Sequence, residues 1–481
     1  MTRIVRPSAF QRKILALEAP GGAPASVSLV VPTITHPGEP FDVKVALADE
    51  MGYPSVAPAG TVMVQGDFAA PAAVEITFRK GAPAVAIARG VTVGAEGLFR
   101  FSAELAGRRF HSNPTFCTAR PREPIYWGDP HVHTVLSACH ADRCRSVPFC
   151  FTAARWFAGL DWTAATDHVS NGRCELARWK EQLAACEAYN DPPRFVTLPG
   201  YEASLQGGRG GDNNVYMLRW PDIFVDEHDE GSIKTLCEKL SGKLKPAAEF
   251  FVVPHHTTRA GKHGEIPDEI YPGEKLMPVV EIHSKWGTSE YRGNPSPLKE
   301  VHPGPGYVVD MLARGLRLGF IAGTDTHSTM PAGFGDEPSH IDRLPGLTAV
   351  VAPRLTRKNI FNALRDRNCY AASLERIYLD VSVAGARGGR TLKAADVPAA
   401  RKIIATAAAR SEIKSIDVVR NGRSIHSKAV GDWKGTLEFE DADDLSGLLM
   451  DSKYLGRFAY YYVRVNCSSG AQAWSSPVWI C

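Results

Sequence analysis

Between residues 123 and 375, short apolar runs end one after another in histidine, aspartate or glutamate. Each run has the length of a buried β-strand. In chain order they are IYWGDPHVH, which ends at His131 and His133, LDWTAATDH at Asp167 and His168, RFVTLPGYE at Glu202, AEFFVVPHH at His255 and His256, MPVVEIH at Glu281 and His283, and LGFIAGTDTH at Asp325 and His327. A chain that repeats this ending needs a fold that brings the ends of its strands together.

Stretches with apolar residues at helical spacing lie among these runs, at 174–190, 231–242 and 356–372. Strands and helices that alternate over about 250 residues are typical of a β/α barrel. The C-terminal strand ends of such a barrel meet on one face, so the polar endings would surround one pocket. We therefore predict an α/β barrel at 123–375.

The sequence on either side of this region has a different texture, with short β-type runs between turns rich in Pro and Gly. Residues 1–122 contain SVSLVVPTI, FDVKVALA and AVEITFR, and residues 376–481 contain IYLDVSVAG, the hairpin signal RNGR and FAYYYVRVNC. Short strands at this spacing are typical of β-sandwiches. The predicted organisation is an N-terminal β-sandwich-like domain at 1–122, the barrel at 123–375 and a small C-terminal β-sandwich-like domain at 376–481.

The charge balance does not indicate binding to a nucleic acid or an anionic membrane. Lys and Arg number 55 against 52 Asp and Glu, which leaves a net charge of +3 and no basic stripe. No apolar run approaches the ~18 residues of a membrane helix, and the N-terminus has no secretory signal pattern. We expect a soluble, cytoplasmic protein whose partner is a small-molecule substrate; the sequence does not indicate its oligomeric state.

The histidines are concentrated in the predicted barrel. Of 15 histidines, 12 fall between His131 and His340. A single histidine near a strand end is more often a packing residue than a ligand. Six strand endings that all carry possible ligands, and that one fold would gather, favour a metal site.

These motifs resemble those of a known family. GDPHVHT, ATDH, GYEAS, VPHH, VEIHSKWG and GTDTHS, in this order, are similar to motifs of the polymerase and histidinol phosphatase (PHP) superfamily. The resemblance is strongest to a branch whose neighbours include carbamate hydrolases of the carbaryl hydrolase type, and the ending YYYVRVNCSSGAQAWSSPVWI is similar to the tail of that branch.

The resemblance implies a distorted (β/α)7 barrel that holds two or three divalent ions, which would be Zn, Mn or Fe. It assigns His131, His133, Glu202 and Asp325 to one ion, and Glu202 would bridge to a second ion held by His255 and His283. A third ion would take His168, His327 and one ligand from the stretch after His133. Asp167 and His256 would then orient ligands, act on the substrate or move a proton. Apart from the resemblance, Arg259 and Lys285 stand just beyond the ligand-bearing strand ends and are candidates to hold an anionic group of the substrate; the alternative is that they are solvated loop charges.

The third-site ligand is where this chain departs from the family pattern. The family places an Asp or His five or six residues after the second His of HxH, but Ala138 and Cys139 stand there. The alternatives are Cys139 as a thiolate, His140 after a one-residue bulge, Asp142, or a site with two metals only. We predict His140, because imidazole suits Zn, Mn and Fe alike, whereas a thiolate favours softer ions and is easily oxidised.

The expected chemistry is hydrolysis by a metal-bridging hydroxide. The chain has no GxSxG elbow and no P-loop, which argues against a serine acyl-enzyme and a nucleoside-triphosphatase. A phosphomonoester or phosphodiester fits a cluster of cations best, because negative charge spreads over several oxygens in its transition state. A carbamate, carboxyl ester or amide is the alternative, and a metal-containing binding module without catalysis is a hypothesis of another class.

Overall fold

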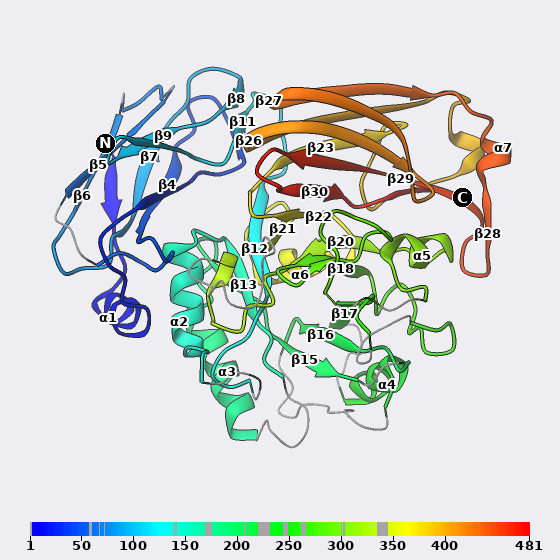
Figure 1. Ribbon diagram of the computed structural model, residues 1–481, viewed down its shortest axis with the longest axis horizontal. Helices are drawn as coiled ribbons and strands as arrows, with labels where there is room; N and C mark the ends of the chain where they lie inside the picture. The colour runs from blue at the N-terminus through cyan, green and yellow to red at the C-terminus, as the bar shows by residue number, and fades with distance from the viewer. Residues whose placement is uncertain are drawn as a thin grey trace.

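The computed structural model describes residues 2–56, 60–66, 68–71, 73–137, 139, 142–168, 176–205, 208–219, 231–243, 249–260, 266–299, 301, 304–333 and 345–481. The N-terminal strands and the C-terminal strands lie side by side above a central region, and strand β12 (Ile125–Val132) runs down between them (Figure 1). Within the described residues, none of the helices is both long enough and apolar enough to cross a membrane. The cytoplasmic location stays a prediction.

The N-terminal strands form two main sheets with one core between them. The sheet orders are β1-β7-β4-β2 and β10-β9-β5-β6, and a third sheet has the order β3-β11-β8. Alternate side chains, such as Val43 on one sheet and Val62 and Val64 on the other, are buried in a single cluster. The elements are β1 (Arg3–Val5), α1 (Ala9–Glu18), β2 (Ser26–Val30), β3 (Ile34–Thr35), β4 (Phe41–Ala48), β5 (Gly60–Gln65), β6 (Ala73–Phe78), β7 (Val85–Val91), β8 (Gly97–Phe99), β9 (Ser102–Leu105), β10 (Arg108–His111) and β11 (Thr115–Cys117).

The central region mixes parallel and antiparallel strands with a few helices. The elements after β12 are α2 (Val147–Thr152), a π-helical turn (Ala153–Phe157), β13 (Trp162–Ala165), α3 (Leu176–Tyr189), β14 (Val196–Thr197), β15 (Gly200–Ser204), β16 (Asp212–Met217), α4 (Ile233–Lys243), β17 (Phe250–Pro254), β18 (Val279–Ser284), β19 (Gly287–Thr288), α5 (Val308–Ala313), β20 (Gly319–Ala322), a 3-10 turn (Pro331–Gly333), β21 (Gly346–Val351), α6 (Arg357–Arg365) and β22 (Cys369–Ser373).

The strand pairing confirms the α/β class of this region without establishing a closed (β/α)7 barrel. Strand β12 is parallel to β13, β13 to β14, and β18 to β20. Strands β15, β16 and β17, however, form an antiparallel meander, and β21 is antiparallel to β12. The regular alternation that the sequence predicted is interrupted because β16 turns directly back on β15.

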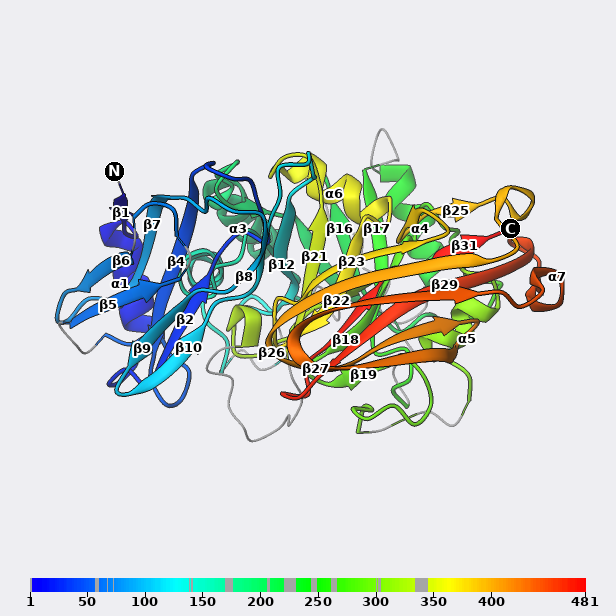
Figure 2. The same ribbon diagram turned by 90° about the horizontal axis from the view of Figure 1, so that it is seen from above.

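The C-terminal strands continue the central sheet. Strand β30 pairs with β22, so that one sheet runs from β14 through β12 and β22 to β29 and β26. Strands β26 and β27 are long and curved, as the view from above shows (Figure 2). The elements are β23 (Tyr378–Val383), β24 (Ala386–Arg387), β25 (Thr391–Leu392), a 3-10 turn (Ala394–Asp396), β26 (Arg401–Arg420), β27 (Arg423–Asp441), α7 (Leu445–Leu448), β28 (Met450–Ser452), β29 (Gly456–Cys467), β30 (Gln472–Ser475) and β31 (Val478–Ile480).

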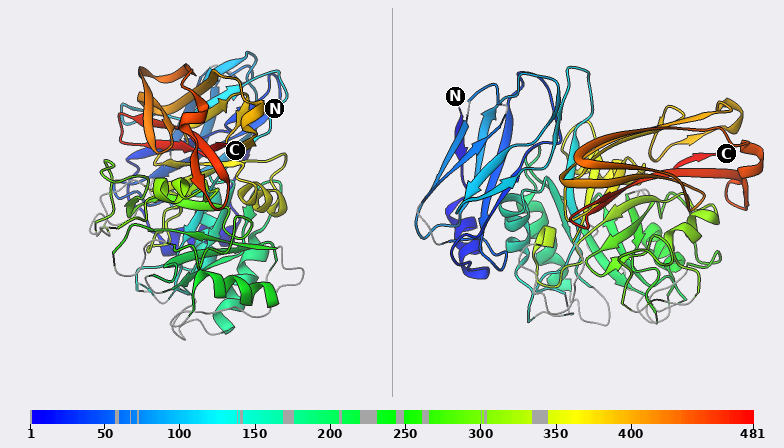
Figure 3. Two further views of the ribbon diagram at one scale, coloured as in Figure 1. Left: turned by 90° about the vertical axis from the view of Figure 1, so that its right-hand side faces the viewer. Right: turned by 45° about the horizontal axis from the view of Figure 1, so that its top comes forward.

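Polar contacts tie the three parts of the chain to one another. Lys44 of β4 forms an ion pair with Asp161 in the central region, at 2.8 Å. The Arg100 guanidinium lies over the ring of Trp433 in β27, at 4.3 Å from its centre. The N-terminal and C-terminal strands thus contact each other as well as the central region (Figure 3). The domain boundaries at 122/123 and 375/376 stay predictions.

Candidate metal centre

Strand β12 carries the first two candidate ligands into the centre of the molecule. His131 lies near its end and His133 directly after it, and both side chains are fully buried. Asp129 on the same strand accepts hydrogen bonds from the backbone N–H of Thr324, at 3.0 Å, and from its hydroxyl, at 2.7 Å. This carboxylate therefore ties β12 to the segment after β20. Burial raises the pKa of Asp129 to about 6, although these hydrogen bonds lower it.

The segment after β20 approaches β12 closely because Gly323 has no side chain. A Cβ atom at this position would lie 2.6 Å from the Cβ of His131 and 2.8 Å from Oε2 of Glu281. Two backbone hydrogen bonds close the contact, from the N–H of Asp325 to His131 and from the N–H of His133 to Thr326. The glycine of GTDTH thus brings Asp325 beside the two histidines of HVH.

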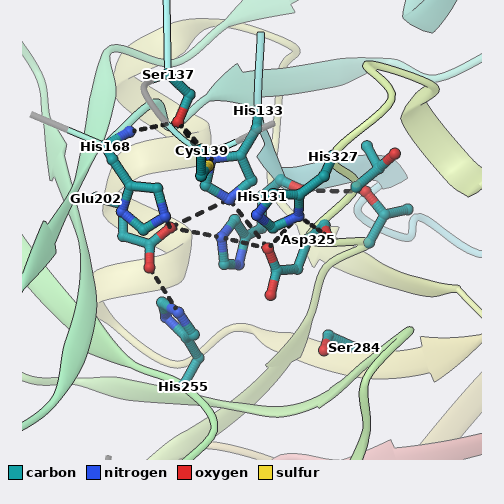
Figure 4. Close-up of polar contacts among 12 residues, drawn as sticks. His131, His133, Ser137, Cys139, His168, Glu202, His255, Ser284, Asp325 and His327 are labelled. Atoms are coloured by element: carbon teal, nitrogen blue, oxygen red, sulfur yellow. Dashed lines mark hydrogen bonds and ion pairs between the residues drawn. The ribbon is translucent and has the colours of Figure 1, made fainter. Parts of the chain in front are cut away.

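The first group of candidate ligands contains His131, His133, Glu202 and Asp325. Nε2 of His133 lies 3.0 Å from Oδ1 of Asp325 and 3.2 Å from Oε2 of Glu202. Nε2 of His131 lies 3.3 Å from each of the same two oxygens. These side chains come from the end of β12, from within β15 and from the segment after β20, and they point toward one another (Figure 4).

Two further groups share the carboxylates of the first. The other oxygen of Glu202, Oε1, lies 3.1 Å from Nε2 of His255, and Asp212 completes that group. The other oxygen of Asp325, Oδ2, lies 3.2 Å from Nε2 of His256, and His255 is the third member there. A carboxylate that faces two groups can bridge two cations.

Two residues of this centre have a left-handed backbone. The φ angle is +51° at His256 and +52° at Asp325. Residues other than glycine adopt this conformation rarely, and such residues gather at functional sites. The two residues with this backbone are also in contact, since Nε2 of His256 lies 3.2 Å from Oδ2 of Asp325.

A fourth group contains the only sulfur atom among these ligands and no carboxylate. Its members are His133, Cys139, His168 and His327. The rings of His168 and His327 lie 4.8 Å and 4.2 Å from the ring of His133. Burial by itself raises the pKa of the Cys139 thiol, but the neighbouring His133, with hydrogen bonds to the three histidines, lowers it to about 2.

The N-terminal helix holds the loop that leads away from this fourth group. The carboxylate of Glu18, at the end of α1, accepts hydrogen bonds from the N–H and the hydroxyl of Ser146, at 2.8 and 2.7 Å. The preceding Arg145 donates to the backbone carbonyl of Ser328, next to His327. The N-terminal part of the chain is therefore connected to the His327 segment.

Histidines supply the positive charge around the buried carboxylates. Burial opposes ionisation of Glu202 and Asp325, yet the surrounding histidines hold the pKa of each well below its usual range. The pKa of His131 is correspondingly raised by Asp325, Glu281 and Glu202, against the effect of burial. In the described part of the chain, the ion-pair partners of Glu202 and Asp325 are all histidines. Divalent cations can take the place of the protons on these rings, so the donor set fits metal ions.

The structure brings together seven of the nine predicted ligands, and other predicted site residues lie elsewhere. His283 belongs to none of the four groups; its Nδ1 lies 2.7 Å from the hydroxyl of Thr288. Asp142 is exposed, with its carboxylate 3.9 Å from Arg143. His140 lies outside the described residues.

The predicted catalytic and substrate residues are placed as follows. Asp167 accepts hydrogen bonds from the N–H and the hydroxyl of Thr134, at 2.5 and 2.8 Å, and burial raises its pKa to about 6. Arg259 lies with its guanidinium 5.5 Å from the centre of the Trp286 ring. Lys285 is buried directly after β18, next to Trp286 in the sequence.

One residue of the centre, Asp212, escaped the sequence analysis, and a second, Glu281, was noted at a strand end but not assigned as a ligand. Asp212 stands at the start of β16, and β16 is antiparallel, so its beginning lies beside the ends of β15 and β17. Glu281 stands two residues before His283, and its Oε2 lies 3.1 Å from Nδ1 of His131. The repeated strand endings contained a signal for Glu281, whereas a search of strand ends could not find Asp212.

Comparisons with known proteins assign no family to the chain. No family model matches it. It is similar to proteins of Chlamydia pneumoniae, Chlamydia muridarum and Chlamydia trachomatis, each named as uncharacterized, with 27%, 27% and 28% identity over 380, 381 and 383 residues. The match covers 77% of this chain, which spans about 60% of the length of these curated relatives.

Two solved structures are similar to parts of the chain at low TM-scores. One is a two-domain protein from Bacteroides vulgatus that contains a predicted PHP-like metal-dependent phosphoesterase, with 12% identity, 72% of this chain and 92% of that chain covered, and a TM-score of 0.40. The other is a β-glucuronidase from Parabacteroides merdae, with 10% identity, 94% and 64% covered, and a TM-score of 0.17. Scores this low do not identify a shared fold.

Proposed function

We propose that this protein is a metal-dependent hydrolase that acts on a phosphate ester. The observation that carries the proposal is the convergence of four groups of His, Asp, Glu and Cys side chains, which share members and come from several central strands and the segments that follow them. Bound divalent cations would lower the pKa of coordinated water and draw electron density from the oxygens of the ester. The substrate would be a small-molecule phosphomonoester or phosphodiester.

The shared carboxylates would divide the ligands between ions. His131, His133, Glu202 and Asp325 would hold one ion. Glu202 would bridge to a second ion, held with His255. Asp212 is a better candidate for this second ion than His283, because it lies within the group and His283 does not. The resemblance of the sequence motifs to the PHP superfamily supports this division, and we propose on the same basis that the central strands form a distorted barrel of that type.

His256 would hold a proton beside the reacting centre. Its Nε2 lies 3.2 Å from Oδ2 of Asp325 and 3.0 Å from the hydroxyl of Ser284. A histidine in hydrogen-bond reach of a carboxylate and a hydroxyl can give a proton to a leaving-group oxygen. Asp167, which bonds Thr134 immediately after His133, would act as a positioning residue rather than contact the substrate.

Arg259 favours a phosphate over a neutral carbonyl compound. It stacks on Trp286, whose ring lies in edge contact with His256 and His327, at 5.9 and 5.7 Å between ring centres. An arginine keeps its charge at any working pH and matches the oxygens of a phosphate. The guanidinium over this tryptophan ring would therefore hold an anionic substrate near the centre.

The test is metal analysis and turnover of the purified 481-residue chain. We expect bound Zn, Mn or Fe, and hydrolysis of p-nitrophenyl phosphate or bis-p-nitrophenyl phosphate with added Mn²⁺ or Zn²⁺. His131→Ala should lose both metal and turnover. The matched control is His426→Ala, because His426 lies in β27 and stacks on Phe439, away from the centre.

Each other outcome selects another function. Hydrolysis of 1-naphthyl carbamates alone would replace the phosphoesterase with the carbamate or ester hydrolase. Bound metal without turnover of any of these compounds would favour a binding module. A protein without metal, in which His131→Ala behaves as the wild type, would exclude the metal centre.

A further inference from the structure

The group around Cys139 differs in chemistry from the other three. They all contain at least one carboxylate, whereas this group offers one sulfur and three imidazoles. Carboxylate ligands suit Mn²⁺ and other hard ions, and thiolate with imidazole suits Zn²⁺. The centre therefore contains two kinds of ligand environment within a few ångströms.

Hydrogen bonds orient the two outer histidines of this group. Nδ1 of His327 lies 3.1 Å from the backbone carbonyl oxygen of Asp325, which can only accept, so Nδ1 is the protonated nitrogen. Nδ1 of His168 lies 2.9 Å from the hydroxyl of Ser204. Partners of this kind fix the ring of a metal-binding histidine and leave Nε2 to act as the ligand.

The sulfur is held by the segment that follows His133. Sγ of Cys139 lies 3.0 Å from the hydroxyl of Ser137 and 3.8 Å from Nδ1 of His133. Nε2 of His133 faces Glu202 and Asp325 instead. His133 thus belongs to the carboxylate ligands through one nitrogen and positions the sulfur through the other.

We propose that Cys139, His168 and His327 form a thiolate-ligated zinc site, which prefers Zn²⁺ while the adjoining carboxylate sites accept Mn²⁺. The inference rests on one part of the proposed function, that the centre binds metal ions. It does not require that the protein catalyses hydrolysis. The proposed ligand differs from the one that the sequence analysis predicted. His140 would give the third ion an imidazole nitrogen, whereas Cys139 gives it a sulfur.

Cobalt substitution of the 481-residue chain tests the sulfur directly. Co²⁺ bound to a thiolate gives a sulfur-to-metal charge-transfer band in the near ultraviolet. We expect this band in the wild type and its loss in Cys139→Ser and Cys139→Asp. Cys144→Ser is the matched control and should keep the band, because this nearby buried cysteine donates its S–H to the backbone carbonyl of His327, at 3.2 Å.

Metal counts in a mixture of Zn²⁺ and excess Mn²⁺ test the preference. The wild type should retain about one equivalent of zinc, and Cys139→Ser should lose that equivalent. Cys139→Asp should keep the total ion count but exchange zinc for manganese, and this variant separates loss of the thiolate from loss of the fold. Circular dichroism of each variant gives the folded fraction.

Three results overturn the proposal: a cobalt form without the band, a band that survives in folded Cys139→Ser, or a zinc equivalent that Cys139→Asp retains against manganese. The outcome is independent of the hydrolase assignment. A band without turnover of any phosphate ester would leave the zinc site standing and remove the function. Turnover without the band would support the hydrolase and exclude the thiolate-ligated zinc site.

Discussion

Two buried sites of this molecule contain charged side chains: the candidate metal centre, and the contact of Glu290 with the C-terminal strands. The two sites differ in the groups that compensate the free-energy cost of burying a carboxylate. Glu290 accepts hydrogen bonds from Tyr462, at 2.7 Å, from Arg464, at 2.9 Å, and from Trp474, at 2.8 Å. Arg464 also forms an ion pair with Asp417, at 3.1 Å. We call these five residues the Glu290 network.

The identity of the positive partner separates the two sites. In the Glu290 network the cation is an arginine, which keeps its charge, and both carboxylate oxygens of Glu290 have fixed donors. In the metal centre, Glu202 and Asp325 face histidines, which can release their protons to a metal ion. Burial of charge therefore does not by itself indicate a functional site. A buried carboxylate set whose partners are histidines is a candidate metal site.

The largest effect should follow from removal of the bridging carboxylate. Glu202→Gln leaves one face of each adjoining group without its charge, so we expect turnover of the best phosphate ester to fall about 1,000-fold, which corresponds to several kcal/mol of transition-state stabilisation. Metal content, measured by mass spectrometry, should fall with it. Glu438→Gln, in an exposed ion pair on β27, should change neither. Unchanged turnover in Glu202→Gln would show that Glu202, like Glu290, is a structural carboxylate and not part of the reacting centre.

The Glu290 network should respond in stability and not in metal content. Glu290→Ala leaves a mostly buried Arg464 with one partner fewer, and we expect the free energy of unfolding in urea to fall by about 3 kcal/mol. Lys402→Ala breaks a pair whose side chains are 57% and 61% exposed, and should cost less than about 0.5 kcal/mol. A loss of bound metal in folded Glu290→Ala would show that the two sites are coupled.

An intermediate effect is expected at Glu281, which touches the metal centre through one histidine. Its Oε2 lies 3.1 Å from Nδ1 of His131 and orients that ring. Glu281→Ala should weaken metal affinity about 10- to 100-fold, as measured by competition with a chelator. Glu281→Gln keeps an oxygen acceptor and should fall between Glu281→Ala and the wild type. Equal affinity in all three proteins would exclude a role for Glu281 in orienting His131.

The two sites also differ in how far the sequence could predict them. The candidate metal centre was accessible because most of its candidate ligands stand at the ends of apolar runs in the sequence, and parallel strands such as β12 and β13 bring such ends together. Asp212 was missed because β16 runs in the opposite direction. Residue 140, predicted as a ligand, lies outside the described residues.

The Glu290 network could not be predicted from local patterns. Glu290 and Arg464 are 174 residues apart in the chain, and they meet because β30 pairs with β22 and extends the central sheet. The alternation in FAYYYVRVNC predicts a strand but not its neighbour, since pairing depends on packing across the sheet. For the same reason the sequence predicted a separate C-terminal sandwich and not the continuity of the sheet.

The smallest effect should come from a half-buried acid with fixed cationic partners, Asp268. Lys453 holds the pKa of Asp268 well below its usual range, with further help from Arg314 and Tyr454. Because the carboxylate is partly exposed, Asp268→Asn should cost only about 1 kcal/mol of unfolding free energy at pH 7. A lowered pKa in the folded state stabilises above the unfolded value of about 3.9 and ceases to do so as the pH falls through the folded value. The difference between wild type and Asp268→Asn in urea unfolding should therefore be constant near neutrality and shrink below about pH 4. Asp451→Asn, an exposed acid on β28, is the control for the change in net charge. If the difference in unfolding free energy instead stayed the same in acid, the stabilisation would not come from the charged pair. The contrast between carboxylates paired with Lys or Arg and carboxylates paired with histidines would then not apply to the surface of the molecule.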